Sequence, residues 1–302
     1  MKKIYLIIAL VLPFTFIYSQ GCSDAGFCSI GSMSINKNGI GNKNVSTLRI
    51  GSSFGSGEQS MKVTTPYLQF EQQFNSWQVQ VKATYNSASL NNNSASGIGD
   101  IFLVGIKSFK NKNGSSTFLN AGLKIPIGNE DLKSNGQSLP LAFQPTLGTL
   151  DFIAGITYQV KTWDFSTAVQ IPLTKNNKNS FIQTALPTMF NGFVSTQKFN
   201  RSADFLVRST KNFKLSNQVG LSTGLLAIYH VADDKFTDNS NKENSINDSK
   251  GLTLNLNLGL NWEINKSLSF NLLSGFPLKV RTVRPDGLTR SFVIVPELIW
   301  KL

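Results

Sequence analysis

Residues 251–264 (GLTLNLNLGLNWEI) alternate between apolar and polar side chains without interruption. A period of two places every second side chain on the same face of an extended strand. A tilted strand needs about 9–11 residues to cross a bilayer, and this stretch is longer than that. The pattern therefore predicts a strand with lipid on one face and water or polar groups on the other. Its apolar positions are Leu252, Leu254, Leu256, Leu258, Leu260, Trp262 and Ile264.

The same alternation recurs along the chain and predicts an all-β fold. We expect a transmembrane antiparallel up-and-down β-barrel of about 12 strands (10–14), closed by pairing the last strand with the first. The predicted strands are residues 45–54, 62–74, 76–85, 97–109, 116–127, 149–160, 162–173, 203–210, 214–231, 251–264, 267–276 and 290–302.

The predicted connections alternate in length along the whole chain. Short turns rich in Asn, Lys and Gly are expected at 74–76, 110–114, 161–162, 211–213 and 265–266. Longer polar segments lie between them, at 55–61, 86–96, 128–148, 174–202, 232–250 and 277–289. Outer-membrane barrels carry short periplasmic turns on one rim and longer extracellular loops on the other. The alternation therefore favours a membrane barrel over a soluble β-sandwich.

Two regions depart from this pattern. Both faces of residues 97–109 are apolar, so the side on which Asp100 lies stays open, and a bulge could shift the register there. Segment 174–202 is too apolar for an ordinary surface loop. It either folds into the barrel mouth or extends the wall as a hairpin. Its candidate lid or solute-capture residues are Phe181, Leu186, Met189, Phe190, Phe193 and Phe199.

Composition and targeting agree with export to the outer membrane. Charged residues make up only 15% of the chain, as expected for an apolar belt around a polar interior. Lys2 and Lys3 precede a short apolar run at 4–17, and Ser19 suits a signal peptidase. These features predict a signal peptide at 1–19, a periplasmic segment at 20–44 and a barrel at 45–302. After the signal peptide, no apolar run reaches the roughly 18 residues of a spanning helix.

The periplasmic segment contains the chain's two cysteines, Cys22 and Cys28. In an oxidising compartment they would form a disulfide that closes a small loop. Lipid modification of Cys22 is the alternative, although Ser19-Gln20-Gly21 is a poor lipobox. The wide gap and the absence of a nearby histidine argue against a metal site.

The formal net charge of +12 does not indicate nucleic-acid binding, because the sequence has no basic helix or aromatic-interleaved basic patch. Outer-membrane lipid and lipopolysaccharide are more natural contacts for surface lysines. Alternation up to the last residue of 290–302 suits recognition by the barrel-assembly machinery.

Alternation also assigns side chains to the lumen. Four of the inward residues are basic and six are acidic, while amides fill most of the remaining positions. Because a strongly selective anion pore needs a basic constriction, we expect weak ionic selectivity, or a plugged interior in which these groups bond to one another. The lumen-facing residues are Arg49, Glu71, Gln78, Gln80, Lys82, Lys124, Asp151, Asp164, Gln170, Asp204, Arg208, Asn255, Asn257, Asn261, Glu263 and Glu297.

Three segments resemble a known family: 96–109 (SGIGDIFLVGIKSF), 122–129 (GLKIPIGN) and 139–160 (LPLAFQPTLGTLDFIAGITYQV). They are similar to the outer-membrane barrel family named for the meta-pathway of phenol degradation, whose members are commonly labelled transporters. The resemblance covers about a quarter of the chain and implies a barrel channel for small, often hydrophobic or aromatic, molecules. The family has no catalytic residues to carry over. Ile127 and the Cys22/Cys28 segment depart from the family pattern and leave the solute class open.

The sequence gives little support for an enzyme, a metal site or a cofactor. His230, the sole histidine, faces inward by alternation, whereas a barrel phospholipase needs its Ser–His pair at the lipid face. No G-x-S-x-G motif occurs. Residues 233–250 contain acidic side chains that could bind calcium, but the spacing lacks the EF-hand pattern and favours a solvated loop. We therefore expect a passive channel for small solutes, with a structural, adhesion or secretion-partner barrel as the alternative.

Overall fold

The structure is a computed structural model that describes residues 44–183, 190–286 and 292–302. Several predictions lie outside these described residues. They concern the signal peptide at 1–19, Cys22 and Cys28, and the lid residues Leu186 and Met189.

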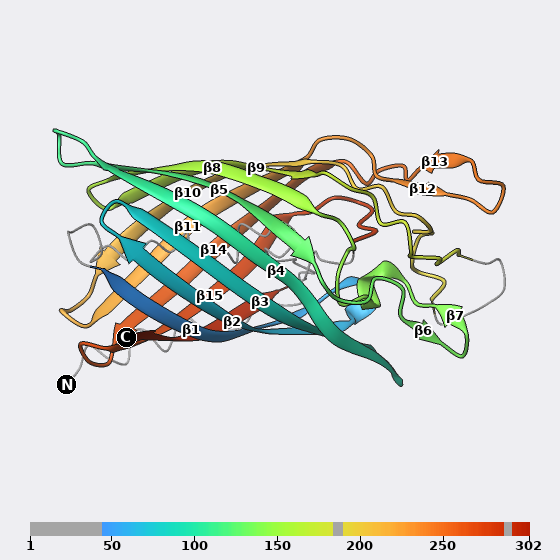
Figure 1. Cartoon of the computed structure of the whole chain (residues 1–302), viewed down its shortest axis with the longest axis horizontal. Coiled ribbons are helices and arrows are strands. Elements are labelled where there is room, and N and C mark those ends of the chain that lie inside the picture. The colour runs from blue at the N-terminus through green and yellow to red at the C-terminus, as the bar shows by residue number, and fades with distance from the viewer. Residues whose placement is uncertain (1–43, 184–189, 287–291) are drawn as a thin grey trace.

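Twelve antiparallel strands close into one barrel, which confirms the predicted fold class and strand number (Figure 1). Each wall strand pairs with the wall strands before and after it in the chain. The wall consists of β1 (Val45–Ser56), β2 (Lys62–Phe74), β3 (Trp77–Leu90), β4 (Asn93–Lys110), β5 (Ser116–Pro126), β8 (Asp151–Val160), β9 (Trp163–Pro172), β10 (Asp204–Lys214), β11 (Val219–His230), β14 (Gly251–Glu263), β15 (Leu268–Lys279) and β16 (Val293–Lys301).

The seam between β1 and β16 closes the barrel. Leu48 pairs with Trp300 in an antiparallel register that continues up to Gly55 and Val293. The backbone N–H of Leu302 donates to the carbonyl of Ser46 at 2.9 Å. The last strand therefore covers the edge of the first, and the sheet keeps no unpaired edge for aggregation.

Strand β14 shows how alternation sorts the two faces of the wall. Leu258 and Trp262 are 44% and 46% exposed on the outside, whereas Thr253 and Asn255 are buried inside. The other strands repeat this arrangement because successive side chains point to opposite faces. The exposed apolar belt includes Ile50, Leu68, Phe70, Trp77, Val81, Leu103, Phe165, Val207 and Leu225.

The predicted loop at 86–96 is wrong, because β3 and β4 continue as a hairpin through this region. Ser87 pairs with Ser96, and Leu90 pairs with Asn93 across a tight turn in which Asn91 adopts a φ of 51°. Small Ser, Ala and Asn side chains keep the backbone pairing but remove the apolar contrast that marks a membrane strand. The connection between β3 and β4 is therefore an exception to the alternation of short and long connections.

The boundary between β10 and β11 also differs from the prediction. Strand β10 runs to Lys214, so the expected turn at 211–213 is wrong. The turn lies instead at 215–218, where the hydroxyl of Ser216 accepts from the backbone N–H of Val219 at 3.0 Å. Lys211 and Asn212 suggested a turn, yet both positions remain in the sheet at the end of the barrel, where polar side chains reach water.

The register between β3 and β4 shifts as the sequence allowed. Ala83 pairs with Ile101, but Tyr85 pairs with Ile98, which marks a bulge. The Asp100 side chain borders the interior cavity, where its carboxylate accepts from the hydroxyl of Thr146. The bulge therefore settles the orientation that the sequence left open.

Most long connections gather at one end of the barrel, opposite the C-terminus (Figure 1). They contain two short hairpins and two single 3-10 turns. Hairpin β6–β7 lies between β5 and β8, and hairpin β12–β13 lies between β11 and β14. These elements are η4 (Glu58–Ser60), β6 (Lys133–Ser134), β7 (Gln137–Ser138), η5 (Leu141–Phe143), β12 (Lys235–Thr237) and β13 (Glu243–Ser245). Among the described residues, no helix has the length and apolar character required to cross a membrane.

The interior is less polar than predicted. A contiguous apolar cluster lines the inner face of β4, β5 and β8 to β11. Polar inward side chains line β1 to β3 and β14 to β16, and they also occur among this apolar cluster, where Lys124, Asp151 and Asp204 are buried. The inner wall of β4, β5 and β8 to β11 therefore combines hydrocarbon with charged and amide side chains. The apolar inward residues are Phe102, Val104, Ile106, Phe118, Ile153, Ala168, Leu206, Leu226 and Ile228.

Candidate functional site: a charged lumen and a packed mouth

The barrel encloses a cavity of about 700 Å³. Its lining includes residues 216–218, in the turn between β10 and β11, and residues 141–147, in the loop between β5 and β8. These two segments belong to opposite ends of the barrel, so the cavity extends along the interior. Small inward side chains at Gly220, Ser222 and Gly224 of β11 leave space on that side of the lumen.

Of the 16 residues that the sequence assigned to the lumen, ten border the cavity and six do not. The cavity-lining members are Arg49, Lys82, Lys124, Asp164, Gln170, Arg208, Asn257, Asn261, Glu263 and Glu297. The members packed behind them are Glu71, Gln78, Gln80, Asp151, Asp204 and Asn255.

The first charge cluster joins the two sides of the seam. Arg49 on β1 contacts Glu71 on β2 through Nε at 2.7 Å and Glu297 on β16 through Nη1 at 2.9 Å. Tyr67 donates its hydroxyl to Glu297 at 3.0 Å, and Gln69 donates to Glu71 at 2.6 Å. Both carboxylates thus contact the same guanidinium and accept hydrogen bonds from neighbouring donors, as buried charges require.

A second cluster stands on the other side of the lumen. Lys124 of β5 contacts the Asp151 carboxylate of β8 at 2.8 Å, and its ammonium also donates to the hydroxyl of Thr149 at 3.2 Å. Lys82 of β3 lies 3.7 Å from the ring centroid of Tyr67, a cation–π contact. These lumen charges therefore form contacts with partners and do not form a ring of side chains that all carry the same sign of charge.

The mouth is packed with aromatic side chains from two loops. Phe143 belongs to the loop between β5 and β8, whereas Phe181, Phe190 and Phe193 belong to the loop between β9 and β10. Phe143 lies 5.5 Å from Phe190 and 5.9 Å from Phe193, in edge-to-face geometry. We call these four rings the aromatic plug. The described parts of segment 174–202 thus fold into the mouth, one of the two arrangements left open by its sequence.

The remaining lid residue, Phe199, is fully buried in a second apolar cluster with Leu141, Leu147 and Ile246. Leu141 and Leu147 come from the loop between β5 and β8, and Ile246 comes from the loop that follows β13. Three long loops therefore share hydrophobic contacts above the lumen. The sequence did not identify Phe143 as part of this group, because the loop around it has no periodicity.

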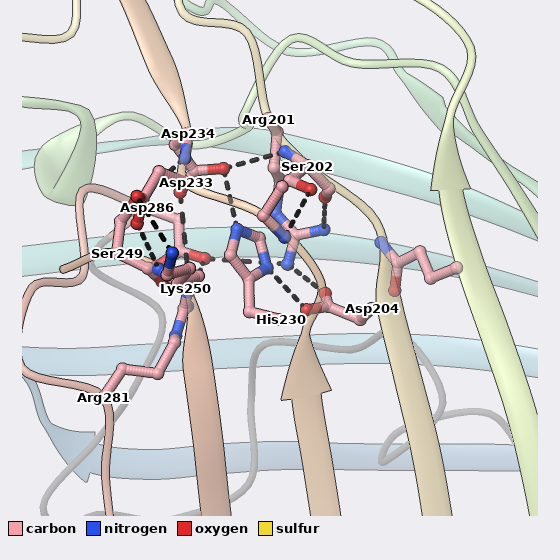
Figure 2. Close-up of polar contacts among 12 residues, drawn as sticks. Arg201, Ser202, Asp204, His230, Asp233, Asp234, Ser249, Lys250, Arg281 and Asp286 are labelled. Atoms are coloured by element: carbon pink, nitrogen blue, oxygen red, sulfur yellow. Dashed lines mark hydrogen bonds and ion pairs between the residues drawn. The ribbon is translucent and has the colours of Figure 1, made fainter. Parts of the chain in front are cut away.

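Beside these clusters lies a buried network of charges, shown in Figure 2. We call it the mouth network. It brings together the ends of two wall strands and three long loops. Its members are Arg201, Asp204, His230, Asp234, Arg281 and Asp286.

His230 lies at the centre of the mouth network. Its Nδ1 lies 2.7 Å from the carboxylate of Asp204, and its Nε2 lies 2.8 Å from that of Asp234 (Figure 2). Both ring nitrogens are thus engaged by carboxylates, and neither contacts a serine. The geometry gives no Ser–His pair at this histidine, as a hydrolase would need.

Two arginines complete the mouth network. Arg201 pairs with Asp204 and lies 3.6 Å from Asp286, while Arg281 contacts Asp286 at 3.0 Å. Burial acts to raise the pKa of Asp286, but the neighbouring Arg281 and Arg201 charges outweigh it and hold that pKa below its usual value. Arg201 comes from the connection between β9 and β10, whereas Arg281 and Asp286 come from the connection between β15 and β16, so the sequence alone gave no reason to group them.

The solvated-loop prediction for 233–250 is only partly right. Asp234 and Ser249, near its two ends, are completely buried. Between them, Glu243 of hairpin β12–β13 is exposed and contacts Lys175 at 2.8 Å and Lys235 at 2.9 Å. These two hydrogen-bonded lysines lower the pKa of Glu243 to about 2. No group of three His, Cys, Asp or Glu side chains suited to a metal ion occurs in the described part of the chain.

Comparison with known proteins agrees with the resemblance noted in the sequence. The family model described as "Putative MetA-pathway of phenol degradation" matches residues 61–292. No curated protein matches the sequence. The barrel is similar to the crystal structure of an outer membrane channel from Pseudomonas putida F1, with a TM-score of 0.64 and 10% identity, covering 89% of this chain and 100% of that one.

A second similar structure is the translocator domain of the autotransporter NalP from Neisseria meningitidis. It gives a TM-score of 0.50 at 12% identity and covers 90% of this chain and 92% of that domain. At such low identities the two likenesses establish a shared barrel fold.

Proposed function

The chain belongs to this MetA-pathway family, and we propose that it is an outer-membrane channel for the passive passage of small solutes. The observation that carries the proposal is the cavity of about 700 Å³ that extends along the barrel interior. An exposed belt of Leu, Phe and Trp side chains around a charged interior suits a wall between lipid and water.

The inner wall supports solutes that combine an apolar body with polar groups. Phe102, Leu273 and Val295 line the cavity together with Lys82 and Arg208. An aromatic or other hydrophobic solute would find hydrocarbon beside hydrogen-bonding groups along the same path. The paired charges around Arg49 and Lys124 support weak ionic selectivity, because each cation there already faces a carboxylate.

Reconstitution tests this function directly. In planar bilayers we expect small conductance steps with little preference between cations and anions. Liposome swelling should be faster with small aromatic solutes than with sugars of similar size. A strong anion preference would contradict the selectivity proposal, and an intact barrel without conductance or swelling would contradict the channel itself.

The second candidate is a barrel that transports nothing and binds a partner through its long loops. The packed mouth favours this reading, because Phe143 and Phe199 are buried where a permanently open pore would be wet. Absence of conductance under all conditions, together with binding lost on deletion of residues 180–199, would identify it.

The aromatic plug gives a sharper test of the channel. Replacing Phe143, the ring that contacts both Phe190 and Phe193, should loosen the packing of the two loops. We expect Phe143→Ala to raise single-channel conductance or open time several-fold. The matched control is Phe70→Ala, which removes a ring from the lipid-facing belt. Equal behaviour of the two variants would show that the plug does not limit passage.

A further inference from the structure

We propose that His230 is a pH-sensitive latch, which holds the mouth loops closed while its ring carries two protons and releases them when one proton is lost. This inference concerns regulation of the mouth and rests on the proposed channel function. It is argued from the contacts of the mouth network (Figure 2).

The first argument is the geometry of the ring. Each nitrogen lies within hydrogen-bond distance of a carboxylate, Asp204 on one side and Asp234 on the other. A carboxylate is only an acceptor, and a neutral imidazole has only one N–H to donate. Both contacts are therefore satisfied together only by the doubly protonated ring. His230 is 1% exposed, so water cannot readily replace the missing donor.

The second argument is the charge balance around the ring. The groups packed about His230 are three carboxylates, from Asp204, Asp234 and Asp286, and two guanidiniums, from Arg201 and Arg281. The protonated ring brings this buried set to neutrality. Loss of one proton leaves an uncompensated negative charge and turns a ring lone pair towards a carboxylate, which is costly at low local dielectric.

A more distant pair borders the mouth network without altering this balance. Lys250 Nζ lies 3.9 Å from the carboxylate of Asp233, and the two charges are of opposite sign. The Asp233 carboxylate also accepts from the backbone N–H of Lys250 at 2.9 Å. This pair closes the base of the 231–250 loop.

The third argument is mechanical. The carboxylate oxygen of Asp234 that faces His230 also accepts from the backbone N–H of Ser202 at 2.8 Å. One atom therefore links the wall, the loop after β11 and the loop before β10. A neutral ring that turns its lone pair towards Asp234 would loosen both loops, which carry Phe199 and Ile246 of the apolar cluster above the lumen.

The pH dependence of the latch has a defined direction. An ordinary histidine titrates near pH 6.5, and stabilisation that requires the protonated ring is present below that value and lost as pH rises through the titration of the folded protein. The mouth should therefore be closed in acid and open in alkali. In planar bilayers, open time should rise about tenfold between an acidic and an alkaline pH on the two sides of this titration.

Two variants of the mouth network should respond in opposite directions. His230→Ala removes the latch and should stay open at both pH values. Asp234→Asn should stay closed at both, because two carboxylates and two guanidiniums then remain and a neutral ring leaves no uncompensated charge. The control Glu243→Gln changes an exposed carboxylate of the same loop and should keep the wild-type pH response. Heat-modifiable gel migration verifies that each barrel is folded.

Release of the loops can also be measured by proteolysis, which does not depend on a conducting pore. The 231–250 loop contains Lys235 and Lys242, and trypsin should cut it faster at alkaline pH. Dividing each cleavage rate by the rate for His230→Ala at the same pH removes the pH dependence of trypsin itself. If this cleavage ratio depends on pH but the protein shows no conductance, the latch proposal is supported and the channel proposal is contradicted. A ratio that is independent of pH, or a wild-type pH response in His230→Ala or Asp234→Asn, would overturn the latch.

Discussion

Replacing Arg49 with methionine is expected to destabilise the barrel by about 3–5 kcal/mol. The substitution removes the cation that lies between Glu71 and Glu297 and leaves two buried carboxylates facing each other. Because Arg49 and Glu297 lie on the first and last strands, the damage falls on the seam that closes the sheet. The measurement is urea unfolding in detergent, followed by heat-modifiable gel migration.

Two further variants show whether charge is the cause. Lys110→Met removes an exposed cation of β4 and should change stability by less than about 0.5 kcal/mol. Adding Glu71→Gln and Glu297→Gln to Arg49→Met removes the stranded charges and should recover most of the loss. If the triple variant is as unstable as Arg49→Met alone, the packing of the Arg49 side chain and not its charge supports the seam.

The sequence predicted the wall well because a membrane strand has a strong physical signature. Lipid on one face and water on the other force a period of two, and β14 ends within one residue of its predicted limit. The same rule assigned Arg49, Lys124 and Glu297 to the lumen. It could not show that Arg49 pairs with a carboxylate 248 residues away, because that contact depends on barrel closure.

Regions without apolar contrast were harder to predict. The β3–β4 hairpin beyond Asn86 is built mostly from small residues, so its sequence shows no alternation of apolar and polar side chains that would predict the strand pairing. The apolar inner wall around Val104 and Leu206 was hidden for the opposite reason. Alternation fails when both faces of a strand are hydrophobic, since neither face can then be identified as the lumen.

The mouth was the least predictable part of the molecule. His230 was correctly placed facing inward, but its carboxylate partners arise from a strand start and a loop. Arg281 and Asp286 come from yet another loop. Contacts between irregular segments depend on how those segments fold over the barrel, and no local sequence rule specifies that arrangement.

The assignment of faces on β14 predicts a sharp contrast between two adjacent residues. Leu256 pairs with Leu225 and Phe276 near the middle of the outer belt, whereas Asn257 borders the cavity. Leu256→Arg should cost about 2–4 kcal/mol, because it brings a charge into the centre of the lipid phase. Asn257→Arg should change stability by less than about 1 kcal/mol, because its guanidinium remains in the lumen.

For conductance we expect the opposite order, with Asn257→Arg having the larger effect and Leu256→Arg the smaller. Gly224 and Gly275 flank Asn257 on the neighbouring strands, so an arginine there has room to extend across the path. Asn257→Arg should lower single-channel conductance and move selectivity towards anions, since it adds an unpaired cation to the pore. Folded Leu256→Arg should conduct like the unmodified protein. If both variants lose stability equally and neither alters conductance, the two faces of β14 have been assigned wrongly and the passage does not follow the lumen.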